Sequence, residues 1–236
     1  MQSPEGRDLD AVPDTTFEAV LFDLDGTLVD STPAVERSWR RWAALWGMGE
    51  GFVVRHGVPA RQVLAGLVPA PDVDRAFADI ERIEIEDVEG VVALPGAARA
   101  LAALPPGRAA VVTSGTRPLA TSRIGAAGLD APAVVVTAED VPVGKPDPAP
   151  YLLAARRLGL DPARCLVVED APAGLTAGRA AGCTTLALTT TSPAAELAAL
   201  GPDLVVATLA DVRFLAGPDG VRLSLEGRAV AVGARA

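Results

Sequence analysis

The chain has 236 residues, half of them hydrophobic, and a formal net charge of −9. This length and composition indicate a globular protein with either one large domain that carries an insertion or two modest domains. Acidic and basic residues are mixed along the chain. Because nucleic-acid binding relies on concentrated positive charge, nucleic acid is not expected as a partner.

The sequence shows no apolar stretch long enough to cross a membrane and no secretory signal, so no membrane association is expected. Residues 1–16 are polar and mildly acidic, and we interpret them as a flexible leader. The two cysteines, Cys165 and Cys183, each lie beside an apolar strand-like run, which is typical of buried free thiols in a reducing compartment. We therefore expect a cytoplasmic protein.

Short apolar runs alternate with helical stretches along most of the chain. The runs predict strands at 19–23, 109–113, 134–137, 165–169, 185–188 and 204–207. The helical stretches, each opening with a proline suited to the first turn, lie at 95–103, 118–126, 148–158 and 172–181. Continuous apolar strands are typical of parallel sheets buried on both faces. The pattern predicts an α/β fold with a doubly wound, Rossmann-like parallel sheet, whose ligands bind beyond the carboxyl ends of the strands.

Two segments depart from this alternation. Residues 32–94 contain helix-like pieces at 33–45, 59–67 and 73–87 with little strand pattern, which predicts a small all-helical insertion into a core made of 17–31 and 95–215. An insertion at this place could close over a site and exclude water. Residues 216–236 form a C-terminal extension, in which a Pro-Asp-Gly turn and alternating runs at 221–225 and 229–232 predict a hairpin.

Two carboxylates follow the first predicted strand, at Asp23 and Asp25. Side chains alternate along an extended chain, so both leave the strand on the same side. Gly26 allows a sharp turn, and the hydroxyl of Thr27 can bond it. Carboxylates this close call for a cation, and they can divide nucleophilic attack and proton transfer between them. A solvated Asp-rich turn is the structural alternative. A calcium loop of the helix-loop-helix type is excluded, because Gly26 follows Asp25 directly.

Three further polar segments follow other predicted strands. Thr113, Ser114 and Gly115 offer hydroxyl and amide donors at the start of a helix, which suits a phosphate oxygen, although Ser and Thr also cap helices for structural reasons. Lys145 is the only lysine in the chain and lies in a loop stiffened by glycine and prolines, where it can neutralise a carboxylate or phosphate.

The remaining polar segment is the acidic pair Glu169 and Asp170, which lies at the end of a predicted strand and is followed by a helix. Helix N-termini favour acidic residues, so capping by Asp170 is the structural alternative to a role in a site. The coincidence of polar segments at four strand ends of one predicted sheet favours a shared site.

Taken in order, the segments that contain Asp23 and Asp25, the Thr-Ser-Gly turn, Lys145 and the Glu-Asp pair resemble the four motifs of the haloacid dehalogenase-like phosphatases. The resemblance extends from about residue 19 to 207. It is strongest to the branch with a small helical cap after the first motif, and within that branch to phosphatases of small sugar and polyol phosphates, including hexitol, hexose and glycerol phosphates.

The resemblance implies a mechanism for phosphomonoester hydrolysis. Asp23 would attack phosphorus and form an aspartyl-phosphate, and Asp25 would protonate the departing alcohol and then activate water. Mg²⁺ would be held by the Asp23 carboxylate, the Asp25 backbone carbonyl and Asp170, with Glu169 either a ligand or a support of the ligands. Lys145 would balance the charge of the nucleophile and of the phosphoryl group.

The resemblance also implies residues that bind substrate. Ser114 would hold phosphate oxygens, aided by Thr113 and the Gly115 amide. His56 and Gly57, in the turn 55–59 between predicted cap helices, resemble the substrate loop of the sugar and polyol phosphatases, although a single histidine can equally be structural. The expected partner is a small phosphorylated molecule, and the expected assembly is a monomer or a weak homodimer.

Other members of the family catalyse different reactions, and a non-catalytic domain is an alternative from outside enzymology. Dehalogenases lack the second acid, and phosphonate-cleaving relatives need a cap lysine that this chain lacks. A beta-phosphoglucomutase-like isomerase shares all four motifs, but it places a histidine where this chain has Val35 and a lysine in its cap. Hydrolysis is therefore favoured over isomerisation, with phosphoglycolate phosphatase as a further alternative. A non-catalytic binding domain would have no need of Asp25.

Overall fold

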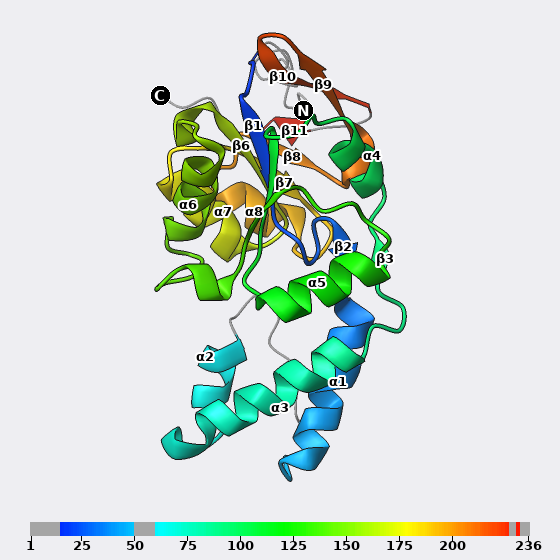
Figure 1. Cartoon of the computed structure of the whole chain (residues 1–236), viewed down its shortest axis with the longest axis vertical. Coiled ribbons are helices and arrows are strands. Elements are labelled where there is room, and N and C mark those ends of the chain that lie inside the picture. The colour runs from blue at the N-terminus through cyan, green and yellow to red at the C-terminus, as the bar shows by residue number, and fades with distance from the viewer. Residues whose placement is uncertain (1–14, 50–59, 227–229, 232–236) are drawn as a thin grey trace, which may run out of the picture.

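The structure is a computed structural model that describes residues 15–49, 60–226 and 230–231. Its main sheet has seven strands in the order β11-β8-β7-β6-β1-β4-β5 (Figure 1). Their bounds are β1 Ala19–Phe22, β4 Ala109–Val112, β5 Val134–Val136, β6 Cys165–Glu169, β7 Thr184–Leu188, β8 Leu204–Val206 and β11 Val230–Ala231. Neighbouring strands pair in parallel except for β11, which is antiparallel to β8. The predicted α/β fold with a doubly wound parallel sheet is confirmed.

Helices cover both faces of this sheet (Figure 1). They are α4 Ala97–Ala102, α5 Arg117–Ala126, α6 Ala149–Leu158, α7 Pro172–Ala180 and α8 Ala194–Ala199. Val20 and Phe22 of β1 belong to the same buried cluster as side chains of α4 and α5, whereas Ala19 and Leu21 join a cluster with α6 and α7. Every strand residue of β1 is thus buried, which explains why the sequence shows a continuous apolar run rather than an alternating one.

The predicted strands begin and end within one residue of the observed ones. The predicted helices agree less closely at their ends, and the short helix α8 was not expected. The helix expected at 95–103 begins only at Ala97, because Gly96 adopts φ +88° and so lies outside the helical region. Pro95 therefore precedes the helix instead of opening it.

A group of helices lies at the opposite end of the molecule from the C-terminal hairpin (Figure 1). It comprises α1 Thr32–Leu45, α2 Ala60–Ala65 and α3 Val73–Glu86, with a 3₁₀ turn at Ala70–Asp72. These helices share their own buried cluster, which includes Trp42, Leu64 and Ile80. The chain leaves the sheet region through β2 Val29–Asp30 and returns through β3 Val92–Ala93, and these two strands pair antiparallel.

The C-terminal hairpin differs from the prediction. It consists of β9 Val212–Gly217 and β10 Gly220–Leu225, so the segment 221–225 pairs with the strand before the Pro-Asp-Gly turn and not with 229–232. Val212 and Phe214 are buried with Val221 and Leu223, and this shared apolar face selects the pairing. The strand β11 instead adds to the main sheet beside β8. No helix among the described residues combines the length and the apolar character of a membrane-spanning helix.

Candidate active site

The carboxyl ends of β1, β4 and β6 lie side by side and bring the predicted motifs together. Phe22 is in register with Val111 of β4 and with Val168 of β6, so the residues that follow each strand meet at one edge of the sheet. The backbone amide of Asp23 donates to the carbonyl of Val168 at 3.0 Å and continues this pairing by one residue. The topology of a parallel sheet therefore places Asp23 next to the Glu169-Asp170 pair.

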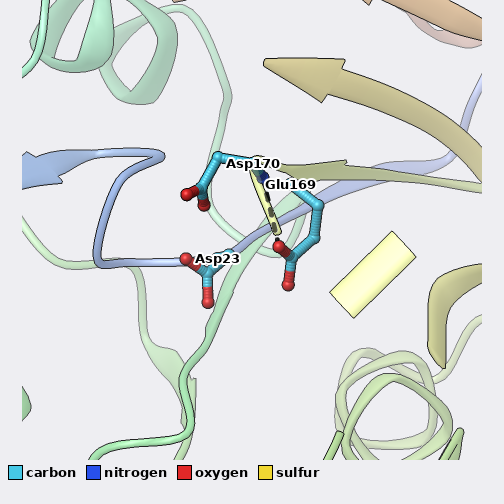
Figure 2. A group of neighbouring side chains, drawn as sticks. All are labelled: Asp23, Glu169 and Asp170. Atoms are coloured by element: carbon cyan, nitrogen blue, oxygen red, sulfur yellow. Dashed lines mark hydrogen bonds between the residues drawn. The ribbon is translucent and has the colours of Figure 1, made fainter. Parts of the chain in front are cut away.

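Three carboxylates gather at this edge, from Asp23, Glu169 and Asp170 (Figure 2). One carboxylate oxygen of each lies within 4.8 Å of the others, and all three residues are buried. Because Asp23 is buried, the alternative of a solvated Asp-rich turn is wrong. Three acids so close together and away from water need positive charge nearby.

Lys145 supplies one positive charge to this group. Its Nζ atom lies 2.5 Å from Oδ1 of Asp23 and 2.6 Å from Oε1 of Glu169, and it also donates to the carbonyl of Val112 at 2.9 Å. Those contacts use all three hydrogens of the ammonium. The side chain is 6% exposed, so these charged contacts are largely shielded from water. Lys145 is thereby fixed against the carboxylate predicted to be the nucleophile.

Glu169 is fully engaged in hydrogen bonds within the protein. Its Oε1 accepts from Lys145 and from Oη of Tyr151 at 2.8 Å, and its Oε2 accepts from the amides of Asp170 at 3.1 Å and Ala171 at 3.2 Å. Four donors occupy the roughly four lone-pair directions of a carboxylate. The carboxylate packs directly on Gly174 of α7, where a Cβ atom would lie 1.6 Å from Oε1. Its orientation is therefore fixed from every side.

Asp170 is held by hydroxyl groups from two other loops. Thr27 donates to its Oδ1 at 3.0 Å, and Thr191 donates to its Oδ2. Gly26 adopts φ +89°, and a Cβ atom there would lie 2.2 Å from Oδ2 of Asp170. The turn after Asp25 therefore needs glycine both for its backbone conformation and for the close approach of this carboxylate.

The electrostatics of the group reflect its burial. Burial raises the pKa of Asp23 well above its usual range, and Glu169 and Asp170 add to this effect while Lys145 opposes it. Burial, aided by the charge of Glu169, raises the pKa of Asp170 to about 7. Burial alone would lower the pKa of Lys145, but Asp23 and Glu169 outweigh it and raise the pKa. Three acids against one ammonium leave excess negative charge, which suits a divalent cation with oxygen ligands.

The carboxylate of Asp25 lies apart from this acidic group and has partners of its own. Its Oδ1 accepts from Oγ of Ser31 at 2.7 Å and lies 2.9 Å from Nη1 of Arg123. Arg123 in turn donates through Nη2 to Oε1 of Glu84 at 3.1 Å. The side chain of Asp25 is 28% exposed, in contrast to the buried Asp23. The two acids of the first motif are thus placed in different surroundings.

The Thr-Ser-Gly turn follows β4 directly. Thr113 is buried and its Oγ1 accepts from the amide of Gly115 at 3.0 Å, whereas Ser114 is exposed. The turn begins one residue after Val112, whose carbonyl accepts from Lys145. A phosphate-binding role for the turn stays a prediction, and so do substrate contacts by His56 and Gly57, which lie outside the described residues.

Helix capping does not account for the polar residues at these strand ends. The N-cap of α7 is Ala171 and that of α5 is Thr116, and neither helix has a side-chain cap hydrogen bond. Capping by Asp170 or Ser114 is therefore ruled out as the reason for their positions. Both residues remain available for a site at the sheet edge.

Some residues at the site were not expected from the sequence. Tyr151 lies within a predicted helix and carries no local signal, although it is the only tyrosine in the chain. Arg123 also lies within a predicted helix, and Glu84 belongs to a different segment altogether. Arg123 is buried next to the apolar Ile124, and nothing in the local sequence distinguishes it from the exposed arginines of the chain.

Comparisons with known proteins agree with the motifs. The family model for haloacid dehalogenase-like hydrolases matches residues 17–182. Hexitol phosphatase A of Escherichia coli (strain K12) is 46% identical over 208 residues, which cover 85% of this chain and 95% of that protein. Glycerol-1-phosphate phosphohydrolase 2 of Saccharomyces cerevisiae is 35% identical over 209 residues, with 83% and 84% covered.

A solved structure is similar over nearly the same length. It is a HAD family hydrolase from Deinococcus radiodurans R1 with bound phosphate and sodium, 32% identical to this chain, with a TM-score of 0.63. The match covers 84% of this chain and 93% of that one. The residues matched by the family model, 17–182, include the helices α1–α3 as well as the strands β1, β4, β5 and β6.

Proposed function

Because the chain belongs to the haloacid dehalogenase-like hydrolases, we propose that it hydrolyses phosphate monoesters of small sugars or polyols, with Mg²⁺ and through an aspartyl-phosphate on Asp23. The observation that carries this proposal is the Asp23 carboxylate, which lies 2.5 Å from the Lys145 ammonium within a group of three buried acids. Relatives that cleave hexitol and glycerol phosphates by name support the choice of substrate class.

The donor set of the site fits magnesium. Asp23 and Asp170 provide carboxylate oxygens whose burial is unfavourable without a cation, and Mg²⁺ prefers oxygen ligands. These two carboxylates would hold the ion with the backbone carbonyl of Asp25. Glu169 already accepts four hydrogen bonds, so its role is to hold Lys145 rather than to bind the ion. Bound Mg²⁺ would neutralise negative charge on the phosphoryl oxygens.

Catalysis then proceeds by two displacements at phosphorus. The carboxylate of Asp23 attacks phosphorus, the bond to the substrate alcohol breaks, and Asp25 gives its proton to that alcohol. Asp25 next takes a proton from water, whose oxygen attacks the aspartyl-phosphate and releases inorganic phosphate, restoring Asp23. The differing surroundings of the two acids suit this division of roles, since the buried Asp23 is fixed by Lys145 while Asp25 is open to water.

Neutralisation of the substrate dianion falls to donors at the same sheet edge. The Lys145 ammonium contributes its positive charge beside Asp23, and the exposed hydroxyl of Ser114 can donate to a phosphate oxygen. The amides of Thr113 and Gly115 already donate to Val136 and to Thr113 within the protein. We assign substrate choice to the cap, residues 32–94, whose helices α1–α3 lie beyond this edge (Figure 1). A docked cap would exclude water from the phosphoryl group before attack.

A phosphate-release screen tests the proposal. The purified chain is incubated with hexitol, hexose, pentose, glycerol and glycolate phosphates and with nucleotides, with Mg²⁺ or with EDTA. We expect magnesium-dependent release from the hexitol and glycerol phosphates, and little from nucleotides. Strong nucleotide turnover, or equal rates in EDTA, would contradict the proposal. Preference for glycolate phosphate would move the assignment to a phosphoglycolate phosphatase.

A second assay separates hydrolysis from isomerisation. Beta-glucose 1-phosphate is supplied with Mg²⁺, and inorganic phosphate and glucose 6-phosphate are measured separately. Hydrolysis gives phosphate without glucose 6-phosphate. Accumulation of glucose 6-phosphate would identify a beta-phosphoglucomutase-like isomerase instead.

A further inference from the structure

A buried arginine connects the acid Asp25 to the helical cap. Arg123 of α5 places Nη1 2.9 Å from Oδ1 of Asp25 and Nη2 3.1 Å from Oε1 of Glu84, which belongs to α3. The side chains of Arg123 and Glu84 are 8% and 9% exposed. In the described part of the chain, Arg123 is the only arginine that is buried.

Stability alone gives a weak reason for this arrangement. Taking a guanidinium and a carboxylate out of water is unfavourable, and buried ion pairs often contribute no more stability than apolar side chains of the same volume. The neighbouring position 124 is an apolar isoleucine that packs into the core. The charges at Arg123 and Glu84 therefore require a reason beyond packing of α3 on α5.

The geometry of the guanidinium supplies that reason. Its nitrogen atoms form a rigid planar fork, so a partner on one nitrogen fixes where the other points. Glu84 holds Nη2, and Nη1 is then directed at Asp25. Ser31 donates to the same oxygen of Asp25 at 2.7 Å. Two donors on one oxygen leave the carboxyl group of Asp25 little freedom to rotate, although it is partly open to water.

The link also depends on the position of the cap. Glu84 reaches Arg123 only while α3 lies against α5, and the adjacent Ser122 donates from α5 to the carbonyl of Ile85 at 3.0 Å. Two neighbouring residues of α5 thus contact two neighbouring residues of α3. Any separation of the helices would remove Glu84 from the guanidinium.

We propose that Arg123 is a positioning residue for the proton-transferring Asp25, and that Glu84 makes this positioning depend on docking of the cap. The inference rests on the proposed function, because it assumes that Asp25 protonates the departing alcohol. It adds that the cap contributes to the chemical step through two named side chains as well as through substrate contacts.

Leaving groups of different basicity isolate this role. The alkoxide of a polyol leaves only with a proton, whereas nitrophenolate is stable enough to leave without one. A misplaced Asp25 therefore slows attack on sorbitol 6-phosphate more than attack on p-nitrophenyl phosphate. The parameter kcat/KM reports steps up to departure of the alcohol, so later hydrolysis of the aspartyl-phosphate does not obscure the comparison.

The experiment measures kcat/KM with both substrates for the full-length parent, Arg123→Met, Arg123→Lys and Glu84→Gln. We expect Arg123→Met to lose about 100-fold on sorbitol 6-phosphate and less than about threefold on p-nitrophenyl phosphate. Arg123→Lys keeps the positive charge but not the planar fork of the guanidinium. It should therefore also lower kcat/KM for sorbitol 6-phosphate more than for p-nitrophenyl phosphate. Glu84→Gln should do so to a smaller extent.

Two controls separate positioning from folding. Arg37→Met breaks the ion pair of Arg37 with Asp87 at 2.7 Å, close to the end of α3, without touching Asp25, and it should leave the ratio of the two substrates unchanged. In an Asp25→Asn background, Arg123→Met should cause no additional loss, because the residue through which it acts is already gone.

The outcomes are distinct. If Arg123→Lys and Glu84→Gln lower kcat/KM equally for both substrates, the role of these residues is structural only and the inference is overturned. Unchanged kcat/KM in all three variants would also overturn it. If Arg123→Met does not fold, the lysine and glutamine variants carry the same ratio test. A parent that hydrolyses neither substrate with Mg²⁺ would overturn the proposed function, and the inference with it.

Discussion

The Oε1 atom of Glu169, the last residue of β6, lies 2.6 Å from the Nζ atom of Lys145, although the two residues are 24 positions apart in the chain. Glu169 donates nothing and accepts four hydrogen bonds, so it acts as a fixed anchor for the ammonium. The same ammonium is 2.5 Å from Asp23. Glu169 therefore fixes the position of the Lys145 ammonium beside Asp23, the proposed nucleophile, and has no free lone pair left to bind a metal ion.

The two members of the acidic pair should differ in their effect on magnesium binding. Asp170→Asn removes a proposed ligand and is expected to abolish measurable Mg²⁺ binding in calorimetry. Glu169→Gln loses an anchor of Lys145 and is expected to weaken binding by about tenfold while it lowers kcat. Asp87→Asn, on the cap, serves as a control for loss of a carboxylate. Abolished binding in Glu169→Gln with retained binding in Asp170→Asn would reverse the two roles.

The nucleophile assignment is tested by Asp23→Asn, which keeps the shape of the side chain but removes its charge. We expect kcat with sorbitol 6-phosphate to fall by about 10⁴-fold or more, because no residue at the site replaces a lost covalent nucleophile. Acid quenching of the parent with radiolabelled substrate should trap a phosphoprotein that hydroxylamine cleaves. An Asp23→Asn protein that becomes labelled, or that is as active as the parent, would show that another residue is the nucleophile.

The close approach of α7 to Glu169 makes Gly174 sensitive to substitution. In Gly174→Ala, the new Cβ atom would lie 1.6 Å from Oε1 of Glu169, so the carboxylate must move away from Lys145. We expect a loss of about 2–3 kcal/mol in unfolding free energy and a lower kcat. Gly125→Ala on α5 has no neighbour within 4 Å of its Cβ and should be neutral or stabilising by up to about 1 kcal/mol. Equal behaviour of the two variants in thermal and activity assays would contradict the packing argument.

The stability of the metal-free protein should fall as the pH rises. Burial raises the pKa of Asp170 from its usual 3.8 to about 7, so between these values the folded state binds more protons than the unfolded state. Rising pH through this window therefore favours unfolding. Thermal melts in EDTA should show Tm decreasing from pH 4 to pH 7 relative to melts with excess Mg²⁺, which binds the deprotonated site.

The control for this pH dependence is Asp170→Asn, which has no proton to lose at that position. In this variant, the difference between the Tm in EDTA and the Tm in Mg²⁺ should change less with pH than it does in the parent. A metal-free parent whose Tm rises over the same window would contradict the assigned direction of the pKa shift.

The sheet was predictable to within a residue because its signal is local. A short apolar run such as 165–169 is buried on both faces, and the residues that follow a parallel strand must lie at the ligand-binding edge. Asp23, Lys145 and Glu169 could therefore be placed together before any coordinates were known. Pairing choices were less predictable, since β10 finds its partner through a shared apolar face and β11 joins the sheet far from its neighbours in sequence.

Arg123 and Glu84 escaped prediction for a different physical reason. Each lies on an ordinary helical pattern, and nothing local distinguishes them from the many exposed arginines and glutamates of the chain. The contact between them depends on how α3 packs against α5. This tertiary packing leaves no periodic pattern in the sequence. Tyr151 is similar, since its hydroxyl finds Glu169 only when α6 packs on the sheet.

The paired strands β2 and β3 carry both crossings between the sheet and the segment that holds helices α1–α3, with Val29 opposite Ala93 and Asp30 opposite Val92. A single two-stranded ribbon is thus the whole covalent boundary of that segment. Among the described residues, exchange of the segment between related chains would need to preserve this ribbon, the α3 contact to α5, and the packing of Ala34 and Val91 into the core cluster of the sheet. New substrate preferences could arise by such grafting while the reaction centre on the sheet stays untouched.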